Sequence, residues 1–171
     1  MKLVFAFILI CITFTSTAKE ISITGTDISF VIPDKFNPLS QEFIDMKWPA
    51  KRAPKWVVSN ESTSTSIAYD LKPNDISAVP LPELVNYFKN TFDRIGPGVA
   101  WIKSEVTEIQ GKKWAYLEFT SNAINADIYN IMLVASYRKE MIIFNFNSTK
   151  EEFPMYEKKL RNSIQSITFG E

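Results

Sequence analysis

The chain has 171 residues, and its 19 Lys and Arg residues balance its 19 Asp and Glu residues. A formal net charge of zero gives no bulk attraction toward nucleic acid or an anionic membrane. Histidine is absent and cysteine occurs once, at Cys11, so Ser-His-Asp and Cys-His catalysis and an ordinary zinc site are excluded.

The first 18 residues carry the pattern of a secretory signal. Lys2 supplies a positive start, an unbroken apolar run spans residues 3–12, and small or polar residues follow up to Ala18. The run is about half as long as a helix that crosses a bilayer, which favours cleavage near Ala18 over retention as an anchor.

Cys11 lies inside the apolar run and follows Ile10, whereas a lipid-attachment cysteine needs a small residue before it. We therefore predict a signal peptide over 1–18 and a single domain over 19–171. The mature protein is expected in the periplasm or outside the cell, with no stable membrane anchor.

Short β-rich runs open the mature chain. The elements expected in its first half are a hairpin over 20–23 and 28–32, a short helix over 41–48, and a strand pair over 56–59 and 66–71. The strongest helix pattern follows, with one apolar stripe at residues 81, 84, 85, 88, 92 and 95. Phe88 and Phe92 should face a sheet, with Lys89 on the other side of the helix.

The second half is rich in strands. We expect hairpins over 101–109 and 113–120 and over 127–137 and 141–147, then a closing helix over about 150–166. The runs 131–134 and 141–144 are apolar at consecutive positions, which is typical of strands at the centre of a sheet covered on both sides.

Three stretches accompany this order of elements: Ile28-Ser-Phe-Val-Ile-Pro33, the Gln110-Gly111-Lys112 turn before Trp-Ala-Tyr-Leu-Glu-Phe, and the closing Ser163-Ile-Gln-Ser-Ile167. Together with these stretches, the order of the elements resembles the PsbP-like fold. Photosystem extrinsic proteins, Ran-binding import factors and DcrB-like bacterial envelope proteins share this fold. The resemblance implies an α+β protein with an antiparallel β-sheet flanked by helices on both faces, an α/β/α sandwich. It also implies a binding or accessory role more often than catalysis.

Carboxylates are the main acid–base groups left. Glu105, Glu108 and Glu118 lie on neighbouring predicted strands, and a carboxylate pair about 5 to 9 Å apart can hydrolyse a glycosidic bond. Glu105 and Glu108 are three residues apart and should point to opposite faces of a strand. We interpret all three as solvent-facing strand residues.

Four oxygen-bearing side chains, Asn122, Asn125, Asp127 and Asn130, fall within nine residues. A calcium site usually needs more than one carboxylate and a glycine in its loop. We interpret this stretch as a polar turn before a strand, and we expect no metal and no cofactor.

The segment 46–56 is the strongest candidate for a binding surface. Four cations crowd around Trp48 and Trp56, and basic groups beside aromatic rings can hold a partner. The candidate binding residues are Lys47, Lys51, Arg52, Lys55 and Trp56. The alternative is that this segment is a connection running over the surface, in which the Trp rings fill the core and the aliphatic parts of the Lys side chains lie over them.

The sequence favours a non-catalytic, exported binding or accessory protein that acts on a protein partner. Two alternatives stay open. One is a histidine-free hydrolase of envelope sugars that uses two carboxylates, and the other is a carrier with a pocket for a small molecule or lipid.

Overall fold

The computed structural model describes residues 19–48 and 53–170. Most strands belong to one seven-stranded antiparallel sheet, in the order β3-β4-β5-β9-β8-β7-β6. Its strands are β3 (Asn37–Pro38), β4 (Trp56–Ser59), β5 (Thr65–Lys72), β6 (Ala100–Ile109), β7 (Lys112–Asn122), β8 (Asp127–Tyr137) and β9 (Glu140–Thr149). The two strands with long apolar runs, β8 and β9, lie in the interior of the sheet, as their sequence predicts.

A second sheet joins the two ends of the described chain. The opening hairpin, β1 (Lys19–Ser22) and β2 (Ile28–Ile32), pairs with the short closing strand β10 (Thr168–Phe169) in the order β1-β2-β10. The sequence predicts the hairpin but not β10, because a two-residue strand carries no periodicity. The tight β6–β7 turn is also as predicted, with Gln110 and Gly111 both at positive φ (48° and 76°).

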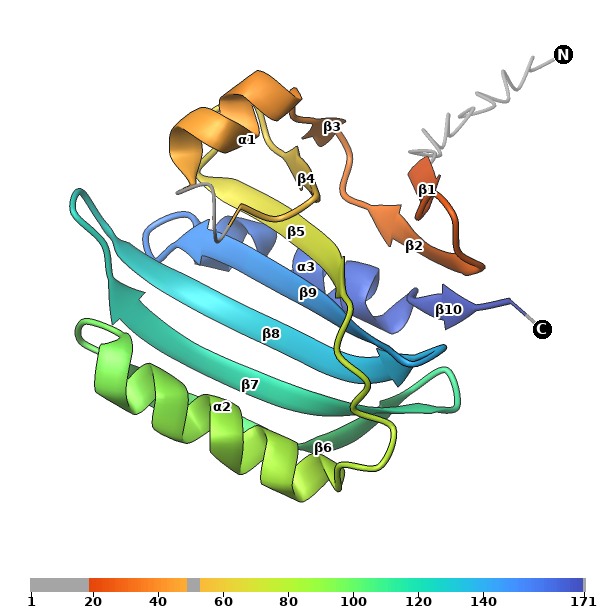
Figure 1. The fold of residues 1–171 in the computed structure, drawn as a ribbon. Helices are drawn as coiled ribbons and strands as arrows, with labels where there is room; N and C mark the ends of the chain where they lie inside the picture. The colour runs from red at the N-terminus through yellow and green to blue at the C-terminus, as the bar shows by residue number, and fades with distance from the viewer. Residues whose placement is uncertain (1–18, 49–52, 171) are drawn as a thin grey trace, which may run out of the picture.

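Three helices cover the seven-stranded sheet. Figure 1 shows α1 (Gln41–Lys47) and α2 (Leu81–Ile95) on the viewer's side of the sheet, and α3 (Phe153–Gln165) behind it. Ser40 caps α1 by accepting a hydrogen bond from the Phe43 backbone N–H, and Pro82 lies in the first turn of α2. The predicted antiparallel sheet with helices on both faces is therefore confirmed.

Each face of the sheet has its own core. On the α3 side, β2 and α3 pack on the sheet around Trp114, Phe144 and Phe146, all at most 1% exposed. On the other side, α2 packs Leu84, Val85 and the predicted pair Phe88 and Phe92 on β7 and β8, while Ile44 of α1 packs on Val57 and Ala68.

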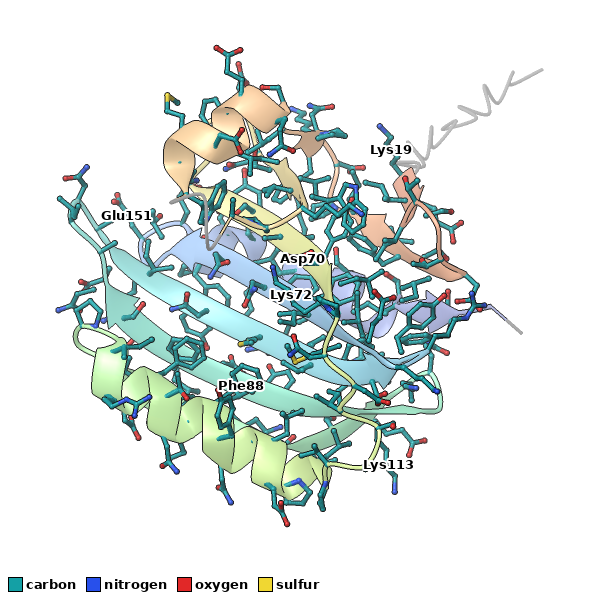
Figure 2. All side chains as sticks on the ribbon, in the orientation of Figure 1. Lys19, Asp70, Lys72, Phe88, Lys113 and Glu151 are labelled. Atoms are coloured by element: carbon teal, nitrogen blue, oxygen red, sulfur yellow. The ribbon has the colours of Figure 1, made fainter. Side chains whose placement is uncertain are left out.

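In Figure 2 the Phe88 side chain points from α2 toward the sheet. The expectation for Lys89 was wrong: its Nζ lies 5.0 Å from the centre of the Trp101 ring, on the flank of α2 beside β6. None of the helices in the described part of the chain has the length and apolar character to cross a membrane.

Candidate functional site

The candidate site lies on the α1/α2 side of the main sheet, between the two helices. Antiparallel register places Asp70 opposite Ile143, Ala68 opposite Asn145, and Asn147 opposite Asn130. Opposed residues point to the same face of a sheet, and Ile143 packs with the α2 core. We call the set Asp70, Lys72, Asn130, Met141, Ile143, Asn145 and Asn147 the interhelical face.

The helices cover the interhelical face only in part. All its residues except Asp70 remain partly exposed, although they lie on strands in the interior of the sheet. Figure 2 labels Asp70 and Lys72, which form an ion pair on β5 between the levels of α1 and α2. The prediction that the central strands are covered on both sides therefore holds fully on the α3 side and only in part on this one.

A pocket of about 260 Å³ opens at the end of this face where α2 terminates. Its lining residues are Phe92, Ile95, Gly96, Pro97, Val99, Phe119, Ser121, Asn130 and Asn145. Two rings of this set, Phe92 and Phe119, are 5.0 Å apart between centroids, and the Trp101 ring lies 4.9 Å from that of Phe119. No charged residue belongs to this lining.

The amides at the pocket are not equivalent. Asn130 Nδ2 donates to the Ser121 hydroxyl at 3.0 Å, and Asn130 Oδ1 accepts from Asn147 Nδ2 at 2.6 Å. Within the described residues, Asn145 makes no side-chain hydrogen bond, so its amide can serve a ligand as both donor and acceptor.

The segment predicted to bind a partner is described only at its two ends. Lys51 and Arg52 lie outside the described residues. Lys47 Nζ donates to the Thr63 carbonyl at 2.7 Å and lies 5.0 Å from the Trp48 ring centre, and burial lowers the pKa of Lys47. The Lys47 ammonium is thus already engaged.

Lys55 and Trp56 are placed differently. Lys55 Nζ lies 4.3 Å from the centre of the Trp56 ring, which stacks on Tyr69 in the α3-side core. Trp48, by contrast, packs with Ile44 and Val57 on the α1 side. The two lysines therefore accompany tryptophans on opposite sides of the sheet, with their charges over the rings.

The expectation for Glu118 was wrong. Glu118 is 3% exposed, because Tyr116 and Glu118 share the β7 face beneath α3. Its carboxylate accepts hydrogen bonds from the hydroxyls of Tyr116 (2.6 Å) and Tyr129 (2.5 Å) and from Arg161 Nη2 (2.8 Å). Glu108 is exposed as expected, and the half-buried Glu105 pairs with Lys103 at 2.7 Å.

The charge of Glu118 is fixed by these contacts. Burial by itself would raise the pKa of Glu118, but the hydrogen bonds from Arg161, Tyr116 and Tyr129 and the Arg161 charge hold it below its usual value. A carboxylate that is ionised and paired with a guanidinium cannot act as a general acid at neutral pH. This cluster ties β7 and β8 to α3.

A second polar cluster also escaped the sequence analysis. Glu152 Oε2 accepts hydrogen bonds from the Asn60 amide (3.1 Å) and from the hydroxyls of Ser64 (2.5 Å) and Thr65 (3.2 Å). It links the β4–β5 turn to the start of α3. Sequence offered no signal, because Glu152 lies about ninety residues from these donors.

The oxygen-rich stretch 122–130 does not converge on one point. The Asn130 amide forms hydrogen bonds with Ser121 and Asn147, while the Asp127 carboxylate lies 3.9 Å from Lys150 Nζ. Among residues 19–48 and 53–170, no three His, Cys, Asp or Glu side chains gather in a way that could hold a metal ion.

Together, the sheet order and the helices on both faces define the PsbP-like fold. The solution structure of cyanobacterial PsbP (CyanoP) from Synechocystis sp. PCC 6803 superposes with a TM-score of 0.65 at 12% identity, over 89% of this chain and 92% of that chain. LpqN of Mycobacterium tuberculosis, described as involved in cell envelope biogenesis, gives 0.56 at 11% identity, over 91% and 86%.

The Ran-binding protein Mog1p of Saccharomyces cerevisiae gives a TM-score of 0.55 at 14% identity, over 88% of this chain and 94% of that chain. No family model and no curated protein sequence matches the chain. Identities this low show a shared fold and carry no site residue from one protein to another.

Proposed function

We propose that this chain is an exported, non-catalytic accessory protein that binds a protein partner through the interhelical face. The observation that carries the proposal is the partial exposure of apolar and amide side chains in the middle of the main sheet, beside an uncharged pocket. Interface cores are typically poor in charge, and pockets lined by aromatic side chains are where interface energy concentrates.

One exposed apolar side chain, that of Ile95, extends this surface beside the pocket. Ile95, at the pocket rim, is 55% exposed. A single exposed isoleucine is ordinary, but one that adjoins an apolar pocket enlarges the area that a partner can bury.

The basic end of the segment 46–56 remains part of the proposal. We propose that Lys51 and Arg52, which lie outside the described residues, contribute positive charge to partner binding. Lys47, Lys55 and Trp56 would contribute less directly, because each already makes a contact within the protein.

Two of the comparisons support this proposal. A Ran-binding protein has the same fold, which is a precedent for partner binding, and LpqN is a precedent for a role in the cell envelope. The predicted signal over 1–18 points to the same compartment. The hydrolase alternative is less favoured, because Glu105 and Glu118 each have a cationic partner.

Site-specific photo-crosslinking tests the proposal in the producing cell. A photoreactive residue at Ile95 should give a discrete crosslinked product with a second protein, since Ile95 borders the interhelical face. Met155 is the matched control, because it is equally apolar and 69% exposed but belongs to α3 on the opposite side of the sheet.

A product from Met155 and none from Ile95 would refute the interhelical face as the binding surface. The absence of any product from either position would refute the protein partner.

A further inference from the structure

We infer that the pocket at the end of α2 is a receptor for one neutral aromatic or branched apolar side chain of the partner, whose adjoining backbone amide bonds to Asn145. This inference rests on the proposed partner-binding function and names the chemistry that the pocket selects.

The size of the pocket argues for a single side chain. Its volume, about 260 Å³, is below the roughly 300–1,000 Å³ of typical small-molecule sites, and it opens onto the surface. A carrier would have to enclose most of its ligand, whereas this pocket would hold one side chain presented from outside.

The lining decides the charge of the occupant. The walls are formed by Phe92, Val99 and Phe119 with neutral amide and hydroxyl groups, and without a charged residue. A charged group that entered would lose its hydration without gaining an ion pair, so a neutral group is favoured. The adjacent Phe92 and Phe119 rings offer an aromatic occupant edge-to-face contact.

Asn145 supplies the polar part of the recognition. The amide nitrogen of its neighbour Asn130 already donates to β7 and β8, and the amide oxygen of Asn130 accepts a hydrogen bond from Asn147. The Asn145 amide, with no such partner among the described residues, matches the donor and acceptor of a peptide group. The apolar walls and this one amide fit an amino-acid residue within a chain.

The wall of the pocket is formed before any partner binds. A Cβ at Gly96 would lie 2.6 Å from Val99 Cγ2 and 2.8 Å from the Phe92 carbonyl oxygen, so only glycine permits this close turn. The turn is anchored to β7, because the Asn122 backbone N–H donates to the Pro97 carbonyl at 2.8 Å. A rigid pocket avoids part of the entropy cost of binding.

Titration of the ¹⁵N-labelled protein with capped amino acids tests the inference by NMR. N-acetyl-phenylalaninamide and N-acetyl-leucinamide, at millimolar concentration, should shift the amide signals of Val99, Ser121 and Asn145. N-acetyl-lysinamide and N-acetyl-glutamic acid α-amide should bind far more weakly. Equal binding of charged and neutral probes, or no shift at these residues, would overturn the inference.

Variants of the pocket complete the test. Asn145→Val should weaken binding of the neutral probes about two- to tenfold through loss of one hydrogen bond. Asn145→Trp should abolish it by filling the pocket. Ser136→Val is the control, a partly exposed polar residue of β8 outside this pocket, and should leave binding unchanged. The NMR spectrum itself reports whether each variant folds.

The outcome is independent of the crosslinking result. Crosslinks at Ile95 without probe binding would keep the protein partner and refute this occupant. Selective probe binding without crosslinks would keep the pocket's preference for neutral side chains and refute the proposed function.

Discussion

Glu118 shows how one buried carboxylate can join three elements. It lies on β7 and accepts hydrogen bonds from Tyr129 on β8 and from Arg161 on α3, which also contacts Glu157 at 2.9 Å. Removing one member of a buried ion pair is costly, because the other charge stays desolvated. We therefore assign Glu118 a role in the stability of the α3 side and not in catalysis.

The lowered pKa of Glu118 makes its contribution depend on pH. A carboxyl group whose pKa is lower in the folded state stabilises the protein above its ordinary pKa of about 4.5, and this stabilisation is lost as the pH falls through the folded-state value. Glu118→Gln should lower the free energy of unfolding at neutral pH by about 1–3 kcal/mol, the usual cost of weakening hydrogen bonds to a charged group.

Urea unfolding of the wild type and Glu118→Gln, compared at neutral pH and at several values below pH 4.5, measures this dependence. The difference between the two proteins should shrink as the pH falls. The exposed Glu108→Gln should change stability by less than about 0.5 kcal/mol. A difference that stays constant over the whole range would contradict the assigned ionisation.

Part of this residue-level picture could be predicted from sequence and part could not. The alternation of Trp114, Tyr116 and Glu118 already places the carboxylate in line with two buried aromatic residues, a signal that outweighs the usual exposure of glutamate. Its cation lies 43 residues further along the chain, and nothing in a single sequence relates the two. The same limit applies to Asn60 and Glu152.

Helix α2 shows what periodicity predicts well. The apolar stripe identifies its buried face, and the structure packs Phe88 and Phe92 against β7 and β8 as expected. Periodicity does not resolve the flanks of the helix. Lys89 lies over the Trp101 ring because β6 extends beside α2, and that neighbour is set by the topology of the sheet.

Phe88→Ala should lower the free energy of unfolding by about 2–3 kcal/mol, below the usual cost for a large core side chain because Phe88 is only partly buried. Asn90, exposed on the same helix, is the appropriate control, and Asn90→Ala should cost less than about 0.5 kcal/mol. Chemical denaturation measures both. Equal losses would mean that the α2 stripe does not hold the helix on the sheet.

The pocket at the end of α2 has a weaker sequence signal. Phe144-Asn145-Phe146-Asn147 alternates buried aromatic and partly exposed amide side chains, which predicts a strand with one polar face. The sequence cannot show that α2 ends next to this strand, or that the turn at residues 96–98 closes the wall. Those facts depend on how distant elements pack.

In the molecule as a whole, the two faces of the seven-stranded sheet are covered unequally. On one side, α3 and the small sheet enclose the aromatic core, and on the other, α1 and α2 leave the interhelical face partly exposed between them (Figure 1). This asymmetry distinguishes the enclosed α3 side from the side that carries the proposed binding surface. The order of elements predicted the fold, while the exposure of one face emerged only from the structure.

The amino-terminal pattern predicts an exported location, which can be measured directly. Lys2 and the apolar run at residues 3–12 should direct the full chain through the secretory pathway, followed by cleavage after Ala18. Protein made in a bacterium with its native first residues should be recovered from the periplasm or medium with an amino terminus at or near Lys19. Mass spectrometry of the intact protein measures this.

Charged residues placed within the apolar run at residues 3–12 should disrupt the predicted signal peptide. The double substitution Leu9→Asp and Ile10→Asp should therefore retain the chain in the cytoplasm, because charge in the apolar region of a signal opposes its insertion. The folded domain should keep the same thermal stability, since neither change lies in residues 19–170. Recovery of only intact chain from the membrane fraction for the wild type would instead indicate an uncleaved anchor and contradict the predicted processing.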